Sequence, residues 1–355
     1  MKGDYDAAYQ KYQKDLEICK EIGDSDGEAS TLHNLATIEI NKGCYDSARE
    51  KFEKILEIRQ QKDNRAGEAS VLHALASIEI YKGEYDVAYE KFQKVIEIRQ
   101  QIGDYHGESS TWHQLATIDM RKGDCDSACK KFQKSLQMSL QIGDLPGEAS
   151  ALHALATIDQ NKGNYDSAKE KFEEAMKIMR QIGDRAGQAS ILNNLATIDL
   201  NKGDHGIARE KFEKAMKIIR ELGDPVAEAS ILNNLATIDF IKGDHDSARE
   251  KLEKAIEITQ QIGDRSGEAT TFYQLGFLAR EQGRSQEGLK LVALCCVIDA
   301  SIGHADTESV FKALSDMASG LKYTQGLSES RLKEVSEAYR KDRGQGLIEA
   351  AFPKA

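Results

Sequence analysis

The chain has 355 residues, of which 30% are charged and only three are prolines, a composition typical of a helical protein. The net charge of −11 argues against a nucleic-acid groove, because such a groove needs a basic stripe. No apolar run approaches the ~18 residues that span a bilayer, and the N-terminus holds no hydrophobic signal region. We therefore expect a cytoplasmic protein without a nucleic-acid or membrane partner, whose six cysteines are reduced thiols.

A repeat with a period of 40 residues runs through most of the chain. Glycine returns at this step from Gly3 to Gly283, leucine from Leu35 to Leu275 and alanine from Ala8 to Ala248. A fixed period of this length indicates stacked units, each of which covers the apolar face of its neighbour. Such an array offers a long surface to a partner.

The first expected element is a leading half-repeat in residues 1–24. Its opening residues, Met1 to Asp4, match the loop that elsewhere separates the two helices of a repeat. The chain would therefore begin with a second-type helix whose apolar stripe lacks a cover; the stripe consists of Ala8, Tyr12, Leu16 and Ile18. Two explanations stay open. The chain is a fragment or a natural split of a longer protein, or another protomer covers this face by self-association.

About seven helix pairs of 40 residues follow, as far as residue 302. Gly203 can take the left-handed conformation that ends a first-type helix. Asp224 is the expected N-cap of the next one, because Pro225 directly after it suits the first helical position. We predict alternating A helices, such as Pro225–Lys242, and B helices, such as Asp244–Ile262. The joining loops are short enough to make each A–B pair an antiparallel hairpin.

Residues 303–355 lose the repeat and are expected to form capping helices and a tail. One A-like helix is predicted over 307–321, with Phe311, Leu314 and Met317 as its stripe, and a polar helix over 328–341. The tail from Gly344 onward is either frayed or docked elsewhere through its apolar side chains, Leu347, Ile348 and Phe352. This divergent end is an alternative interaction site.

The repeat resembles the tetratricopeptide repeat, in the long variant found in kinesin light chains and spindle-orientation adaptors. The resemblance covers residues 1–302 and rests on the spacing of Leu32, Leu35, Ala36, Gly43, Tyr45, Ala48, Phe52 and Ile55. A longer linker such as Ile182–Gly187 replaces the usual proline at the end of the B helix. The resemblance implies an all-α, right-handed α-solenoid of antiparallel helix hairpins, whose A helices line a concave surface.

Carried onto this chain, the concave surface would present three columns of side chains, one residue per hairpin. The first column reads His33, His73, His113, His153, Asn193, Asn233 and Tyr273. The second reads Thr37, Ser77, Thr117, Thr157, Thr197 and Thr237, and the third reads Asn41, Tyr81, Arg121, Asn161 and Asn201. These neutral hydrogen-bonding groups would suit an extended peptide or protein segment whose backbone needs partners.

Each column also has a purely structural interpretation. The histidines belong to different hairpins roughly 10 Å apart, too far apart to share one metal ion. They would form either a polar binding wall or hydrogen bonds to neighbouring helices, and both interpretations stay open. The threonines are expected to bond back to their own helices. The best candidates for contacting a peptide backbone are Asn193, Asn194, Asn233 and Asn234.

Lys/Glu runs such as Arg209–Lys211 are interpreted as solvated surface.

No catalytic motif or metal-ligand pattern stands out, and we expect neither an enzyme nor a cofactor. Cys125 and Cys129 lie four residues apart without a second pair of ligands nearby. The sequence therefore predicts a non-catalytic scaffold that binds a peptide or protein segment. The alternative is a sensor arm of a larger bacterial effector, such as a nucleotide-dependent switch or a caspase-like protease. Similar arrays occur in such effectors, and a chain that begins inside a repeat would fit this alternative.

Overall fold

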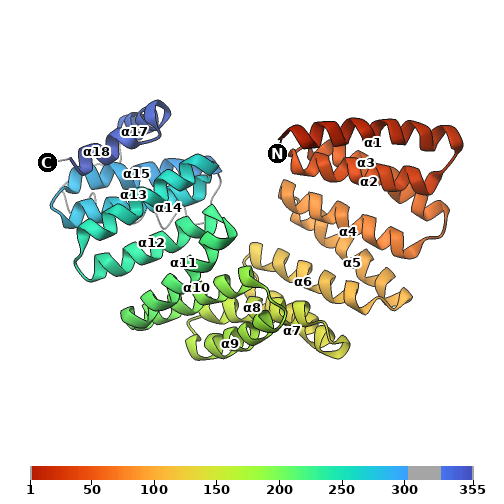
Figure 1. The fold of residues 1–355 in the computed structure, drawn as a ribbon, viewed down its shortest axis with the longest axis horizontal. Coiled ribbons are helices and arrows are strands. Elements are labelled where there is room, and N and C mark those ends of the chain that lie inside the picture. The colour runs from red at the N-terminus through yellow and green to blue at the C-terminus, as the bar shows by residue number, and fades with distance from the viewer. Residues whose placement is uncertain (1, 303–328, 354–355) are drawn as a thin grey trace. The chain divides into compact units, whose positions relative to one another are not determined.

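The computed structural model describes residues 2–302 and 329–353. All regular structure in these residues is helical, and the chain divides into two compact units, Met1–Ile182 and Gly183–Ala355 (Figure 1). The first unit contains α1(Lys2–Ile22), α2(Ser25–Asn41), α3(Tyr45–Gln61), α4(Arg65–Lys82), α5(Tyr85–Ile102), α6(Tyr105–Arg121), α7(Cys125–Ile142), α8(Leu145–Asn161) and α9(Tyr165–Gln181). The second contains α10(Arg185–Lys202), α11(His205–Leu222), α12(Pro225–Ile241), α13(His245–Ile262), α14(Arg265–Glu281), α15(Ser285–Ile302), α17(Glu329–Asp342) and α18(Gln345–Ala351).

Within each unit the helices pack as hairpins in sequence order, which confirms the predicted all-α solenoid. The even-numbered helices from α2 to α14 are the A helices, and the odd-numbered ones from α1 to α15 are the B helices. Each A helix packs against the B helix that follows it, and B helices such as α3, α7 and α13 pack against the next A helix. Residues 307–321, where one capping helix is expected, lie outside the described residues.

The loops follow the predicted helix-ending chemistry. Gly203 ends α10 with φ 87°, a left-handed conformation that glycine adopts without a side-chain clash. Asp224 is the N-cap of α12, and its Oδ1 accepts a hydrogen bond from Ala227 N at 3.1 Å. Helix α13 begins at His245 rather than Asp244, because Asp244 is itself the N-cap and bonds Ser247 N.

Small and aromatic residues let the two helices of a hairpin approach closely. Ala36 on α2 and Ala48 on α3 are completely buried, as are their counterparts in most later hairpins. The phenylalanines of the B helices are buried in the same way; they are Phe52, Phe92, Phe132, Phe172 and Phe212. These side chains fill the space between helices, so the columns that repeat most strictly are packing positions.

The leading helix α1 is less isolated than the sequence suggests. It packs against α2, and Leu16 joins the first apolar cluster of the array. Ala8 and Tyr12 are half-buried, whereas Ile18 is 54% exposed. The expectation that this stripe has no cover is therefore wrong for its first three residues.

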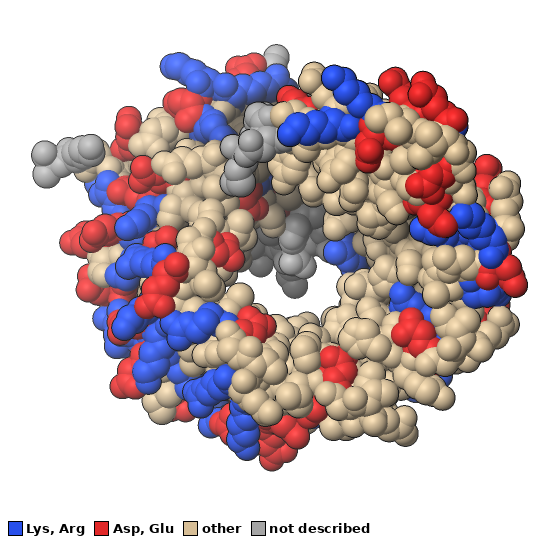
Figure 2. Space-filling view, turned by 45° about the vertical axis from the view of Figure 1, so that its right-hand side comes forward, with Lys and Arg blue, Asp and Glu red and all other residues tan. Residues whose placement is uncertain are grey.

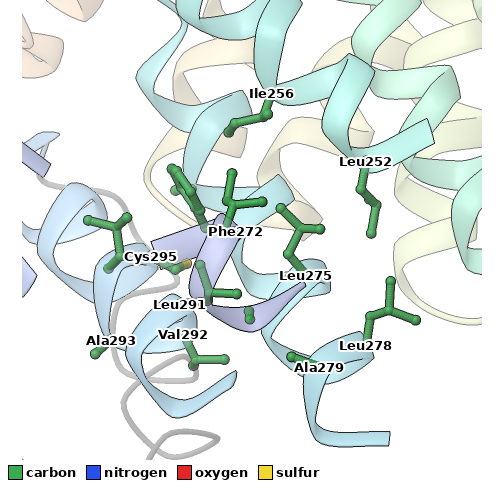
Figure 3. Packing of buried hydrophobic residues seen from close by; sticks show 14 of the residues in the cluster. Leu252, Ile256, Phe272, Leu275, Leu278, Ala279, Leu291, Val292, Ala293 and Cys295 are labelled. Carbon is green, nitrogen blue, oxygen red and sulfur yellow. The ribbon is translucent and has the colours of Figure 1, made fainter. Parts of the chain in front are cut away.

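The last hairpin lies within a large cluster of buried apolar residues in the second unit (Figure 3). Phe272 and Leu275 of α14 meet Leu291 and Cys295 of α15 in one apolar cluster. The C-terminal segment docks on this hairpin. Helix α17 coincides within one residue with the helix expected over 328–341. The tail is docked rather than frayed as far as Phe352, which is buried with Ile348.

Candidate ligand-binding surface

The histidines of the first column pack on the phenylalanine of their own hairpin. The ring centroids are 5.4 Å apart for His33 and Phe52, and 5.1 Å apart for His73 and Phe92. The equivalent distances are 4.8 Å at His113 and 5.5 Å at His153. His33 is exposed, whereas the other three histidines are half-buried. Each ring thus covers the aromatic core and shows part of its edge at the surface.

Burial keeps the imidazoles of His73, His113 and His153 neutral. It lowers the pKa of His73 to about 4, and the positive charge of Arg99 adds to this effect. Burial also lowers the pKa of His113, with a smaller contribution from His153, and it lowers the pKa of His153 itself. At neutral pH the three rings offer hydrogen-bonding nitrogens without a charge.

The asparagines of the second unit bond across neighbouring hairpins. Asn233 is buried; its Nδ2 lies 3.1 Å from Thr271 Oγ1, and the same hydroxyl donates to Asn233 Oδ1 at 3.2 Å. Asn234 donates through Nδ2 to Asn193 Oδ1 at 3.2 Å. The side chain of Asn233 therefore links α12 to α14. Tyr273, at the same position of the next repeat, lies with its ring centroid 4.8 Å from that of Phe277.

The second column bonds back into its own helices. Thr37 Oγ1 donates to His33 O at 2.9 Å, and Thr117 Oγ1 donates to His113 O at 3.0 Å. The same bond to the carbonyl four residues earlier recurs at Ser77, Thr157, Thr197 and Thr237. Each hydroxyl proton is thereby used inside the helix, and the oxygen keeps lone pairs that can accept.

The third column lies at the ends of the A helices, beside the A–B turns, and it is exposed. Tyr81 stacks on Tyr45 of the preceding hairpin with ring centroids 5.5 Å apart. Arg121 lies over the Tyr85 ring at 6.0 Å in the same way. Asn41, Asn161 and Asn201 are exposed in the equivalent places. Where aromatic or basic residues occupy this column, they therefore contact the neighbouring repeat.

Hollows open between successive A helices of the first unit. One of about 390 Å³ lies between α2 and α4, and its lining includes His33, Asn34 and Ser70. Another of about 230 Å³ lies between α6 and α8, and its lining includes His113 and Gln114. The first column and the residue that follows it thus line both hollows, whose remaining walls are mostly serine, glycine and small apolar residues.

Sequence reasoning missed a row of carboxylates on the A helices, all of them buried except the half-buried Asp159. Each contacts a lysine twelve residues later on the B helix: Lys51 Nζ is 2.6 Å from Glu39 Oε1, and Lys171 Nζ is 2.7 Å from Asp159 Oδ2. The pairs Lys91–Glu79, Lys131–Asp119, Lys211–Asp199 and Lys251–Asp239 repeat this contact. The recurrence of an acid and a lysine at a fixed offset was visible in the sequence.

This row corrects the interpretation of the Lys/Glu runs as solvated surface. Lys211 contacts the buried Asp199, and Arg209 contacts the buried Asp239 of the next hairpin. Two members of that run therefore hold helices together. On the face shown in Figure 2, acidic and basic side chains are mixed, and no broad basic stripe is visible.

The described residues hold no group of three or more His, Cys, Asp or Glu side chains arranged to bind a metal ion. None of the helices that the structure describes is long and apolar enough to cross a membrane.

An array of helical hairpins with a 40-residue period defines the chain as an α-helical repeat protein. The tetratricopeptide repeat profile matches it at residues 1–61, 27–101, 107–181, 148–221, 187–261 and 227–292, and the chain belongs to this family. None of the curated proteins matches the sequence.

Solved structures with the same fold share little sequence with this chain. The apo form of RapI has a TM-score of 0.64 at 14% identity, over 96% of this chain and 98% of its own. A Rap protein complexed with Competence and Sporulation Factor has a TM-score of 0.60 at 12% identity, over 98% and 99%. A signal transduction ATPase with a tetratricopeptide repeat sensor, from Pyrococcus horikoshii, has a TM-score of 0.55 at 14% identity, over 94% of this chain and 55% of its own.

Proposed function

We propose that this protein is a non-catalytic scaffold that binds a peptide or protein segment on the surface formed by its A helices. One observation carries the proposal: the polar hollows between α2 and α4 and between α6 and α8, in which Arg59 and Asp144 respectively are the charged residues of an otherwise uncharged lining. Histidine, asparagine, glutamine and serine groups line them, and these both donate and accept hydrogen bonds. An extended segment needs such partners for its backbone. The solved complex of a Rap protein with Competence and Sporulation Factor is a precedent for ligand binding on this fold.

The test changes two exposed side chains in one hollow and no buried one. His33→Ala combined with Asn34→Ala removes two exposed side chains from the α2–α4 hollow. The partner is first isolated by pull-down with the wild-type chain and identified by mass spectrometry. Its affinity for the double variant should then fall at least about tenfold, the effect of losing one or two hydrogen bonds.

The matched control is Lys54→Ala, which removes an exposed side chain from the outer side of α3. Circular dichroism should show both variants folded as the wild type. Equal affinity of the partner for the double variant and for the control would contradict binding at this hollow.

A further inference from the structure

A third hollow, in the second unit, differs in chemistry from the two polar ones of the first unit. It measures about 450 Å³ and lies between α12 and α14, with α13 as its floor. Its lining is Ala236, Thr237, Phe240, Ala248, Leu252, Thr270, Tyr273, Gln274, Phe277 and Leu278. No charged side chain lines it, and its size falls in the range of ligand-binding pockets.

Three substitutions in the repeat create this pocket. Phe277 stands where earlier repeats carry threonine or serine, and Tyr273 stands where they carry histidine or asparagine. Phe240 replaces an aliphatic, methionine or glutamine side chain. The three rings are half-buried and pack on the apolar cluster of the last hairpins, so their outer faces remain available to a ligand. The Thr237 hydroxyl donates a hydrogen bond to Asn233 O of its own helix, and Phe277 has no hydroxyl to make the equivalent bond.

The rim of the pocket carries a few polar groups. Gln274 Nε2 lies 3.4 Å from Thr237 Oγ1, and Gln274 Oε1 is buried without a hydrogen-bond partner among the described residues. Thr270 Oγ1 donates to Ser266 O, which leaves its oxygen able to accept. An apolar interior with accepting groups at the edge suits a side chain that enters from a peptide backbone.

We propose that this aromatic pocket anchors one neutral aromatic or branched aliphatic side chain of a bound peptide segment. The inference rests on the proposed function and extends it from a neutral polar surface to a specific anchor. The absence of charge in the lining selects against Lys, Arg, Asp and Glu at the anchor position, because their charge would lose its water without gaining a partner. The position of the pocket between successive A helices, as in the two polar hollows, favours a peptide segment over a second copy of the chain.

The experiment selects ligands from a phage-displayed library of linear twelve-residue peptides on the full chain. Selected peptides should share a Phe, Trp, Leu or Ile at one position. Replacing that residue in the synthetic peptide by Ala or Glu should weaken binding at least tenfold, measured by calorimetry. Phe277→Thr should weaken binding of the parent peptide by about tenfold, because the pocket loses an aromatic ring from its α14 wall.

Further variants keep the test independent of folding. Phe277→Thr introduces the residue that other repeats carry at this position, and Tyr273→Asn does the same. Phe277→Leu keeps an apolar pocket and should retain most of the affinity. Ile207→Ser is the matched control: it replaces a 51% exposed apolar residue of α11 by the serine found at equivalent positions. It should leave binding unchanged.

The outcomes separate this inference from the proposed function. Selected peptides that lose affinity with the His33/Asn34 double variant but not with Phe277→Thr would overturn the pocket and support the scaffold. A wild-type dimer that Phe277→Thr converts to a monomer in light scattering would assign the pocket to a second copy and overturn the peptide anchor. Failure to select any peptide would count against both proposals.

Discussion

Lys251 Nζ lies 2.7 Å from Asp239 Oδ2 and joins the two helices of the α12–α13 hairpin. Asp239 is only 3% exposed, and it also contacts Arg209 of the preceding B helix and accepts from Ser247 Oγ at 2.9 Å. These hydrogen bonds lower the pKa of Asp239 against the opposing effect of burial. One carboxylate therefore links a hairpin internally and to its neighbour.

Asp239→Asn should destabilise the second unit by about 2 kcal/mol, because it leaves the half-buried Lys251 and Arg209 without their buried counter-charge. The check is a thermal or urea unfolding curve of the full chain. The comparison variant is Asp239→Ala with Lys251→Leu, which introduces the apolar pair that the last hairpin carries at Ala279 and Leu291. This double variant should lose less stability than Asp239→Asn. It leaves only Arg209 without a partner, whereas Asp239→Asn leaves both Arg209 and Lys251 without one. Equal stability of Asp239→Asn and the wild type would contradict a structural role for the carboxylate.

His73 should make the first unit sensitive to mild acid. Its pKa is about 4 in the folded chain and about 6.5 when unfolded, so the unfolded state binds the proton first. Stability is fully present above pH 6.5 and falls as the pH drops from 6.5 towards 4. The loss reaches at most about 3.5 kcal/mol, from about 1.4 kcal/mol for each pKa unit.

The test for His73 is the pH dependence of unfolding between pH 7 and pH 4.5. His73→Asn introduces the residue that Asn193 and Asn233 place in this column, and it should flatten the profile. His33→Asn is the control, because it makes the same substitution at an exposed position of the same column. A profile that keeps its slope in His73→Asn would show that other groups cause the acid sensitivity.

The repeat, its loops and its packing columns could be predicted from the sequence because each depends on local spacing. Gly203 and Asp224 mark helix ends by their own backbone preferences, and Ala36 and Ala48 mark close approach by their size. The surroundings of the first column could not be predicted. Whether Asn233 faces a ligand or Thr271 depends on how adjacent hairpins are spaced, which no single repeat encodes.

The aromatic pocket also could not be predicted from the sequence. Phe277 and Tyr273 were visible as departures from the repeat, but aromatic residues on a helix usually complete a core. Only the packing of α12 against α14 leaves their faces around a hollow. The binding surface itself remains a prediction, as do the boundaries between array and cap.

Gly276 and Gly288 set the spacing of the last hairpin. A Cβ added at Gly276 would lie 2.5 Å from Val292 Cγ2 and 2.8 Å from Gly288 O, so the backbone of α15 would have to move. Gly276→Ala should therefore lower stability by about 1–3 kcal/mol, although alanine is the better helix former. The measurement is the shift of the unfolding midpoint. Gly206→Ala, which meets no atom within 4 Å, should be neutral or stabilising, and a similar loss in both variants would contradict the steric argument.

Arg343 should hold the C-terminal segment on the array. Its Nη1 donates to Gln260 O at 2.9 Å, its carbonyl accepts from Gln260 Nε2 at 3.0 Å, and its guanidinium contacts the fully buried Glu268. Arg343→Ala leaves Glu268 with hydrogen bonding from Tyr339 alone among these cap residues. The docking of α17 and α18 should weaken by about 2 kcal/mol, the cost of stranding a buried charge.

Native-state hydrogen exchange measures this weakening directly, because the cap can open without unfolding the repeats. Amides of α17 and α18 should exchange about 30-fold faster in Arg343→Ala, since each 1.4 kcal/mol is a factor of ten. Amides of α12 should keep their rates. Arg340→Ala, which removes an exposed arginine from the last turn of α17, three residues before Arg343, is the matched control. Unchanged exchange in α18 of the Arg343 variant would show that the apolar contacts of Ile348 and Phe352 are sufficient to dock the cap.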